Sequence, residues 1–124
     1  MDIRQKLIRV IDSEAQAISN IQVTDQFENA VNLLHSCNGK VVATGIGKAG
    51  FIARKFAATL ASTGTPAIYI HPAEAGHGDL GMLAEDDCIV AFSTSGKSNE
   101  VIEMLEMAQQ LGITEIIGVT SHAQ

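Results

Sequence analysis

Length, composition and charge limit what this chain can be. Its 124 residues give room for one domain, because a hydrophobic core of ordinary size is filled within roughly 100–150 residues. Its apolar content of 46% excludes a largely disordered chain, and its net charge of −6 excludes a general attraction to nucleic acid or anionic membranes.

Residues 1–38 have the spacing of two helices. Apolar side chains recur every three or four positions on one face of residues 2–19, with Glu14 as one polar exception. These apolar residues are Ile3, Leu7, Val10, Ile11 and Ile18. A second helix is predicted from about Thr24, a residue type that caps helices, to Asn38 and Gly39, which end it. The interleaved charges of the first ten positions do not fit a signal peptide, and no stretch is long enough to span a bilayer.

Residues 39–124 alternate between short apolar strands and helices. Strands are predicted at 41–44, 67–70, 88–92 and 115–119, and helices at about 48–62 and 98–111. Unbroken apolar strands separated by helices are typical of a parallel sheet that is covered on both faces. We therefore predict a three-layer, doubly wound parallel α/β sheet. The residues expected to pack on it are Ala49, Ile52, Ala53, Phe56 and Leu60 from the first helix and Val101, Met104, Leu105, Ala108 and Leu111 from the second.

The two cysteines are expected to be structural. Cys88 stands inside the apolar run CIVAF, where a small buried side chain is expected, and Cys37 lies outside any strand. We predict that both are free thiols in a reducing cytoplasm, where disulfides rarely persist.

The segment TGIGKAG, Thr44 to Gly50, joins the first strand to its helix. Gly45 and Gly47 let backbone N–H groups approach a ligand, and the helix that begins there presents its positive end. A glycine turn with a purely structural role is the alternative. We expect neither a nicotinamide cofactor nor any other cofactor.

The segment STSGKSNE, Ser93 to Glu100, stands between a strand end and a helix start. Its hydroxyl groups belong to Ser93, Thr94, Ser95 and Ser98. Four hydroxyls, a glycine and free N–H groups at a helix N-terminus make a site for a phosphate monoester. The alternative is helix capping, with Ser95 or Ser98 as the N-cap, but capping explains one hydroxyl and not four.

The segment HPAEAGHGDLGM, His71 to Met82, is a long connection that carries His71, Glu74, His77 and Asp79. Loops with several ionisable groups often carry function. Metal binding is one interpretation, but the segment lacks the compact ligand spacing of known metal sites, and we expect no metal.

Together, these three segments resemble the SIS-domain phosphosugar isomerases. The run STGTP followed by AIYIHPAEAGHGDLGM is most similar to the arabinose 5-phosphate isomerases among them, and the similarity extends from about Val41 to Val119. The resemblance implies a flavodoxin-like SIS fold and an aldose–ketose isomerase that interconverts D-arabinose 5-phosphate and D-ribulose 5-phosphate through an enediol. A non-catalytic, regulatory phosphosugar-binding domain, an isomerase for another phosphosugar and an SIS-type amidotransferase domain are the alternatives.

The resemblance also implies the roles of single residues. Lys48, His77 and Glu100 match the family's active-site residues, and the phosphate-binding hydroxyls match Ser93, Thr94, Ser95 and Ser98, with Gly45 and Gly47 beside them. Glu100 is the candidate base that removes a proton beside the carbonyl, and Lys48 offers positive charge to the substrate. His77 could open the sugar ring or move a proton between oxygens. The alternatives are a solvated glutamate at a helix start and a histidine that is hydrogen-bonded within its loop.

The family pattern carries two further expectations. Family members continue past the fourth strand into a fifth strand and helices that contribute another active-site histidine, whereas this sequence ends at Gln124, and His122 comes too early to be that residue. We therefore expect a single, C-terminally truncated SIS domain over residues 1–124, without CBS domains. We also expect a homo-oligomer, a dimer or tetramer, in which His77 of one subunit acts with the Glu100 of its partner.

Overall fold

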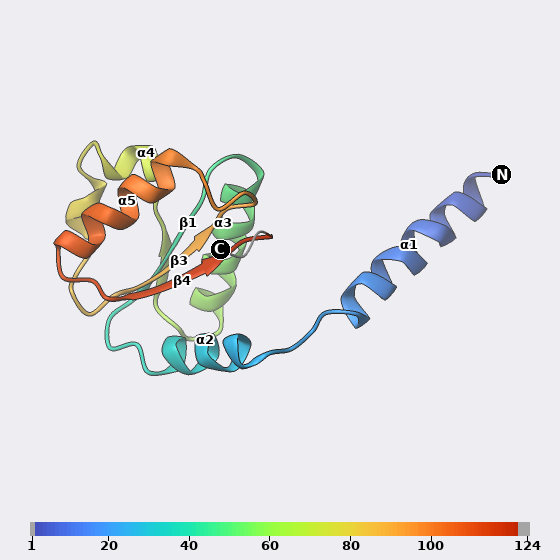
Figure 1. The fold of residues 1–124 in the computed structure, drawn as a ribbon, viewed down its shortest axis with the longest axis horizontal. Helices are drawn as coiled ribbons and strands as arrows, with labels where there is room; N and C mark the ends of the chain where they lie inside the picture. The colour runs from blue at the N-terminus through green and yellow to red at the C-terminus, as the bar shows by residue number, and fades with distance from the viewer. Residues whose placement is uncertain (1, 122–124) are drawn as a thin grey trace.

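The computed structural model describes residues 2–121, so His122 lies outside the described residues. They form two N-terminal helices and a four-stranded sheet with helices on both faces (Figure 1). In chain order the elements are α1 (Ile3–Ser19), α2 (Asp25–His35), β1 (Val41–Thr44), α3 (Gly47–Ser62), β2 (Ala67–Tyr69), α4 (Pro72–Ala75), η1 (Asp79–Met82), β3 (Cys88–Phe92), α5 (Asn99–Gln110) and β4 (Glu115–Val119). The predicted strands and helices are thus confirmed. The connection of residues 71–82 contains the short turns α4 and η1.

The sheet has the strand order β2-β1-β3-β4, and every neighbouring pair is parallel. The chain moves from β1 to β2 on one side and returns to place β3 on the other side of β1. Val42 stands at the centre, paired with Ile68 and Ile89. This order is that of the flavodoxin-like doubly wound fold, in which ligands bind beyond the strand ends where the winding reverses.

Alternate side chains of the sheet enter two apolar clusters, one on each face. Val42, Ile70 and Ile89 meet Met104 and Ala108 of α5 on one face. On the other face, Ala43 meets Ala53 and Ala57 of α3, and the Phe56 ring packs edge-on against Phe92 with centroids 5.4 Å apart. The sheet is therefore the middle layer of three, as predicted.

The face that α3 turns to the sheet differs in part from the prediction. Its buried residues are Gly50, Ala53 and Ala57, whereas Ile52 is 58% exposed. The reason is the short distance between the helix and the end of β1. A Cβ atom on Gly50 would lie 2.8 Å from the carbonyl oxygen of Gly45, so no side chain fits at Gly50, near the start of the helix.

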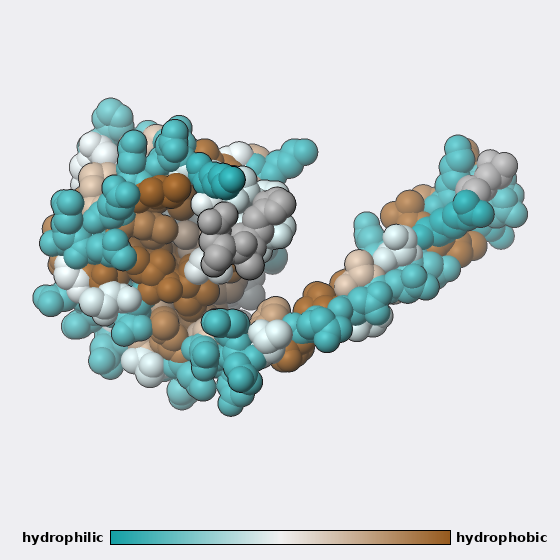
Figure 2. Space-filling model, viewed as in Figure 1, coloured by the Kyte–Doolittle hydropathy of each residue, from teal (hydrophilic) through white to brown (hydrophobic). Residues whose placement is uncertain are grey.

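The two N-terminal helices form as predicted but bury no side chain. α1 begins with a capping box, in which Asp2 accepts a hydrogen bond from the Gln5 backbone and Gln5 accepts one from the Asp2 backbone. Figure 1 shows α1 projecting away from the sheet, and Figure 2 shows apolar side chains along its length. None of the helices in residues 2–121 combines the length and apolar character needed to cross a membrane.

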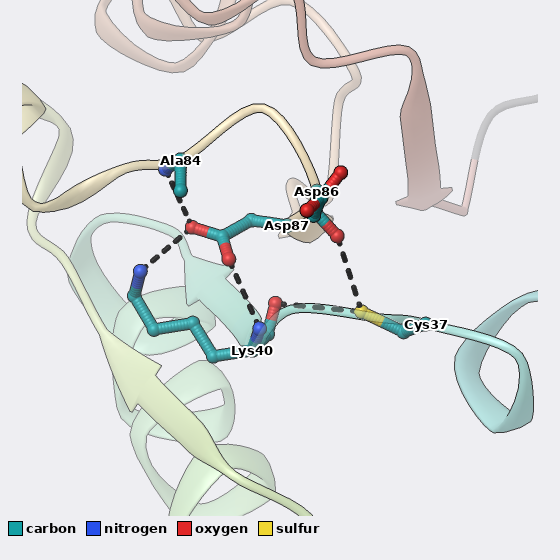
Figure 3. Close-up of polar contacts among 5 residues, drawn as sticks. All are labelled: Cys37, Lys40, Ala84, Asp86 and Asp87. Carbon is teal, nitrogen blue, oxygen red and sulfur yellow. Dashed lines mark hydrogen bonds and ion pairs between the residues drawn. The ribbon is translucent and has the colours of Figure 1, made fainter.

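A buried carboxylate joins two loops at the amino end of the sheet (Figure 3). Asp87, 2% exposed, accepts hydrogen bonds from the Lys40 ammonium at 2.7 Å, the Lys40 backbone at 2.9 Å and the Ala84 backbone at 2.8 Å. Desolvation alone would raise the pKa of Asp87, but these bonds outweigh it and hold the pKa below its usual value. Gly39 is required beside it, because a Cβ atom there would lie 2.5 Å from Asp87 Oδ1. We call Asp87 with its Lys40 and Ala84 partners the Asp87 clamp.

The cysteines lie near this clamp, and both thiols are free, as predicted. Cys37 is half-buried and its Sγ lies 3.7 Å from the Asp86 carbonyl oxygen and 3.6 Å from that of Lys40. Cys88 is buried in β3, and burial raises the pKa of its thiol to about 12. A thiol that stays protonated in this way is a packing group and not a nucleophile.

Replacing the buried carboxylate should destabilise the fold in a pH-dependent way. We expect Asp87→Asn to lower the free energy of unfolding by about 2–4 kcal/mol near neutral pH, because Lys40 loses its partner. The folded-state pKa of Asp87 lies below the unfolded one, so its contribution is present above the unfolded pKa and is lost as the pH falls through the folded value. The difference in the free energy of unfolding between the parent and Asp87→Asn should therefore become smaller at acidic pH.

Urea unfolding of both proteins at about pH 7 and about pH 3 measures this difference. Asp86→Asn is the matched control, since Asp86 is exposed and contributes only its backbone carbonyl to the neighbouring hydrogen bonds. An equal loss of stability at both positions would show that the clamp does not hold these loops.

Candidate active site

The two unusual loops of the sequence lie side by side at the carboxyl edge of the sheet. β1 and β3 are neighbours, and Thr44 at the end of β1 is in register with Ala91 of β3. The loop of residues 44–50 leads into α3, and the loop of residues 93–98, here called the serine loop, leads into α5. Two helix N-termini therefore meet at the point where the winding of the sheet reverses.

The first loop is held tightly against the sheet. Gly45 is buried, and a Cβ atom on it would lie 2.9 Å from the Phe92 carbonyl oxygen. The Tyr69 hydroxyl donates to the Gly45 carbonyl, and the Arg54 guanidinium lies 4.3 Å from the centre of the Tyr69 ring. Burial raises the pKa of Tyr69, with Arg54 opposing that shift, so the hydroxyl keeps its proton for this bond.

α3 begins without a side-chain cap. Its N-cap residue is Ile46, and Gly47 opens the helix with a φ of 60°, a conformation that favours glycine. The Ile46 side chain makes no capping hydrogen bond to the first-turn N–H groups. These donors and the helix dipole are therefore available to an anion.

The glycines of this loop do not by themselves identify the ligand. Gly45, Gly47 and Gly50 have the spacing G-x-G-x-x-G, which also occurs where dinucleotides bind. Dinucleotide sites add an acidic residue near the end of the second strand to hold the ribose. Here β2 ends at Tyr69, followed by Ile70 and His71, so that part of a dinucleotide site is missing.

The serine loop uses its hydroxyls to shape its own backbone. The Oγ atoms of Ser93 and Ser98 lie 3.3 Å apart, and the Gly96 backbone donates to Ser93 Oγ at 3.0 Å. The Lys97 backbone donates to Ser95 Oγ at 3.0 Å. Ser98 occupies the N-cap position of α5, but its side chain does not cap the helix. Capping therefore does not account for these hydroxyls.

Two residues after β4 complete the loop, and the sequence analysis missed them. The carbonyl oxygen of Thr94 accepts from Ser121 Oγ at 2.7 Å, Thr120 Oγ1 at 3.2 Å and the Ser121 backbone at 3.3 Å. The Ser93 backbone also donates to the Val119 carbonyl at 3.0 Å. The sequence feature that could have indicated them is the Thr-Ser pair directly after β4, the strand that neighbours β3. We call Thr120 and Ser121 the hydroxyl latch.

Two cavities flank the serine loop. One of about 400 Å³ is lined by Lys48, Ser93 and Thr94 together with the hydroxyl latch. The other, of about 200 Å³, is lined by Ser93, Ser98 and the first turns of α5. Ser93 thus faces both spaces. Lys48, which is exposed in the first turn of α3, lies across the first cavity from the loop.

The other two predicted active-site residues lie outside these cavities. His77 is exposed in the connection after α4, and Glu100 is exposed in the first turn of α5. α4 contacts α5 within the same chain, and Figure 1 shows α4 beside the start of α5. The structure therefore brings Lys48 together with the serine loop. It places His77 and Glu100 outside the two cavities, in the connection after α4 and in the first turn of α5.

The remaining ionisable groups of the long connection are partly structural. His71 is the N-cap of α4, and its Nδ1 accepts a hydrogen bond from the Ala73 backbone at 3.1 Å. Within residues 2–121, no three His, Cys, Asp or Glu side chains are grouped so that they could hold a metal ion. His71 is thus assigned to the local backbone, and His77 is the exposed imidazole of this segment.

Comparison with known proteins connects this geometry to one family. The SIS domain family profile matches residues 33–124. The chain is 43% identical over 118 residues to the arabinose 5-phosphate isomerase KdsD of Pseudomonas aeruginosa, covering 94% of this chain and 36% of that protein. It thus spans about a third of the length of the curated relatives it matches.

Solved structures show the same fold. An Escherichia coli protein in complex with arabinose 5-phosphate aligns at 41% identity with a TM-score of 0.85, covering 98% of this chain and 67% of that one. A Bacteroides fragilis protein, a putative phosphosugar isomerase involved in capsule formation, aligns at 42% identity with a TM-score of 0.91, covering 98% of this chain and 66% of that one.

Removing one hydroxyl of the latch should loosen the serine loop. We expect Ser121→Ala to weaken binding of a phosphate monoester roughly threefold to tenfold, the effect of one lost hydrogen bond. An NMR titration that follows the Gly96 and Lys97 amides measures the affinity. Ser62→Ala, which removes a hydroxyl bonded to the Thr59 carbonyl at the far end of α3, should bind like the parent. Unchanged affinity in Ser121→Ala would mean that the latch does not position the loop.

Proposed function

The chain belongs to the SIS domain family, and from this membership we propose that it carries the phosphosugar site of an aldose–ketose isomerase. The proposed reaction interconverts D-arabinose 5-phosphate and D-ribulose 5-phosphate. Relatives named arabinose 5-phosphate isomerase, at about 40% identity, support this choice of substrate. The structure of a relative in complex with arabinose 5-phosphate supports it further.

One observation carries the proposal, namely the uncapped N-terminus of α5 behind a loop of hydroxyls. Ser98 stands at the N-cap without bonding the helix backbone, so the first-turn N–H groups remain available for an anion. The chain has a net charge of −6, and an anionic ligand must therefore be held by local donors. The serine loop and the adjacent Lys48 supply such donors in one place.

Phosphate bound at this loop would fix the sugar relative to Glu100. Glu100 lies two residues after Ser98 in the same helical turn, so a substrate anchored by its phosphate keeps a constant distance to the carboxylate. In the proposed step, the carboxylate takes the proton from carbon 2 of the aldose. The resulting carboxylic acid exchanges its proton with water and then delivers a proton to carbon 1 of the enediol. Meanwhile a hydroxyl proton moves from oxygen 2 to oxygen 1, so no atom is gained or lost.

Lys48 and His77 take supporting roles in this proposal. The Lys48 ammonium would stabilise the negative charge that develops on the enediolate oxygens or on the phosphate. His77 would open the sugar ring or carry the proton between the two oxygens. Both side chains are exposed and free to move toward a bound sugar.

Changing the proposed base should stop turnover and spare binding. We expect Glu100→Gln to lower kcat by about 10²- to 10⁴-fold, because the amide keeps the shape of the side chain but cannot accept the proton. Binding of D-arabinose 5-phosphate should change little. NMR in D₂O measures both, since turnover places deuterium on the sugar carbon and titration gives the affinity.

Glu103→Gln is the matched control, an exposed glutamate one turn further along α5. It should turn over like the parent. Parental turnover in Glu100→Gln would remove Glu100 as the base. If the parent chain binds the phosphosugar, and neither it nor a version that continues past Gln124 through the expected further histidine exchanges a carbon-bound proton, the isomerase proposal is wrong and a non-catalytic phosphosugar-binding role takes its place.

The proposed reaction should not depend on a metal ion. The donors of the site are hydroxyls, backbone N–H groups and Lys48, which suit a phosphate and not a cation. We expect turnover to be the same before and after treatment with a chelator and dialysis, measured by the same deuterium exchange. Loss of activity that one specific metal ion restores would contradict the assignment of the site.

A further inference from the structure

The single tyrosine of the chain has a hydroxyl that its packing does not explain. Tyr69 ends β2, and its half-buried ring packs with Ala43, Ala53 and Phe56 in the apolar cluster between the sheet and α3. A phenylalanine ring would fill the same space. The tyrosine hydroxyl, however, donates to the carbonyl of Gly45, in the loop that leads into α3. The hydroxyl therefore holds the loop, and the ring holds the core.

The Gly45 carbonyl lies just outside the hydrogen-bond ladder of α3. The bond that opens the helix runs from the Gly50 N–H to the carbonyl of Ile46, the N-cap residue, at 3.2 Å. Gly45 is buried, and a buried carbonyl needs a donor. Tyr69 supplies that donor to the carbonyl directly before the N-cap. Its hydroxyl therefore fixes how the chain enters the helix.

The helix is shaped to admit this hydrogen bond. A Cβ atom on Gly50 would lie 3.2 Å from the Tyr69 hydroxyl oxygen and 2.8 Å from the Gly45 carbonyl oxygen, so the bond uses the space that this glycine leaves. One turn further along α3, the Arg54 guanidinium lies 4.3 Å from the centre of the Tyr69 ring, within the range of a cation–π contact. The helix thus contacts the tyrosine at two positions, one that leaves room for its hydroxyl and one that holds its ring.

The start of α3 is also one wall of the proposed site. Lys48 is the second residue of the helix and lines the cavity of about 400 Å³ that it shares with the serine loop. Only Ile46 and Gly47 separate it from the Gly45 carbonyl. Among the described residues outside the turn itself, none comes within 4 Å of a Cβ atom built on Gly47, so packing does not fix the turn at that position. The hydrogen bond to Gly45 is the nearest restraint before Lys48.

We propose that Tyr69 is a positioning residue of this site. Through the Gly45 carbonyl, its hydroxyl fixes the first turn of α3 so that the Lys48 ammonium faces a phosphosugar held by the serine loop. Tyr69 itself contacts no substrate in this arrangement. Its effect is to order the Lys48 side of the site before the ligand arrives, which lowers the entropy that binding costs. This inference rests on the proposed function, because Lys48 has this role only if a phosphosugar binds between the two loops.

Tyr69→Phe tests the hydroxyl alone, since the ring and its packing remain. We expect its affinity for D-arabinose 5-phosphate, measured by NMR titration, to fall roughly threefold to tenfold, the effect of one lost hydrogen bond. Thr63→Ala is the matched control, because it removes a hydroxyl that donates to the Thr59 carbonyl at 2.9 Å at the far end of α3. This control should bind the sugar phosphate like the parent.

A double-mutant cycle tests whether the hydroxyl acts through Lys48. Lys48→Met and Ser95→Ala should each weaken binding by themselves. If Tyr69 positions Lys48, adding Tyr69→Phe to Lys48→Met should weaken binding less than about twofold, because the side chain that it positions is already gone. Added to Ser95→Ala, on the other loop, it should weaken binding by the same factor as in the parent. A hydroxyl with a merely structural role would have equal effects in the two backgrounds.

Amide hydrogen exchange of the free protein tests the restraint on the loop without any ligand. Tyr69→Phe should speed exchange at Gly50, whose N–H bonds the Ile46 carbonyl at the helix start, while the amides of β3 exchange as in the parent. Unchanged exchange at Gly50, parental affinity in Tyr69→Phe, or equal effects in the two backgrounds of the cycle would each overturn this inference and leave the proposed function in place. If the parent itself does not bind the sugar phosphate, the proposed function is wrong, and this inference with it.

Discussion

The pairing of β1 with β3 is the constraint on which the rest of the structure depends. Because these strands are parallel neighbours in the middle of the sheet, the loops that follow them leave at the same edge. Each loop must turn at once into a helix that returns across the sheet. Two helix N-termini with uncapped N–H groups are therefore fixed next to each other before any ligand is considered. The glycines and serines of the two loops are what this meeting point requires.

The two loops solve the same steric problem in different ways. The first comes so close to β1 and Phe92 that side chains are excluded, and Gly45 and Gly50 allow the contact. The second stays further out and is stabilised by hydroxyls, including those that follow β4 at its own end. The anion that we propose for this site fits an acidic protein, because the donors are dipoles fixed by the backbone, which the overall negative charge does not neutralise.

Much of the fold could be predicted from the sequence because it rests on local patterns. Apolar runs such as CIVAF and helical spacing around Met104 identify strands and helices directly. The prediction of which α3 residues face the sheet was partly wrong. Helical periodicity places the large Ile52 on that face, but it does not show how closely Gly50 approaches Gly45. The serine loop was found because its composition is unusual. The hydroxyl latch was not, because the contact of Ser121 with Thr94 joins positions that only the order of strands brings together. The roles of Lys48, His77 and Glu100 remain predictions.

The Asp87 clamp and the serine loop lie at opposite ends of the same strands, and this separation has a consequence for how the protein can change. The amino end holds the Lys40–Asp87 ion pair and Gly39, where no larger residue fits. Substitutions at this end therefore lower the stability of the fold. At the carboxyl end, Gly45 and Gly50 are buried and close to the sheet, but Thr94, Ser95 and Lys97 of the serine loop are exposed and lie outside the core. Mutations that alter the ligand can therefore accumulate at one end without unfolding the other. A scaffold divided in this way can give rise to descendants that share its framework but differ in the ligand that they bind.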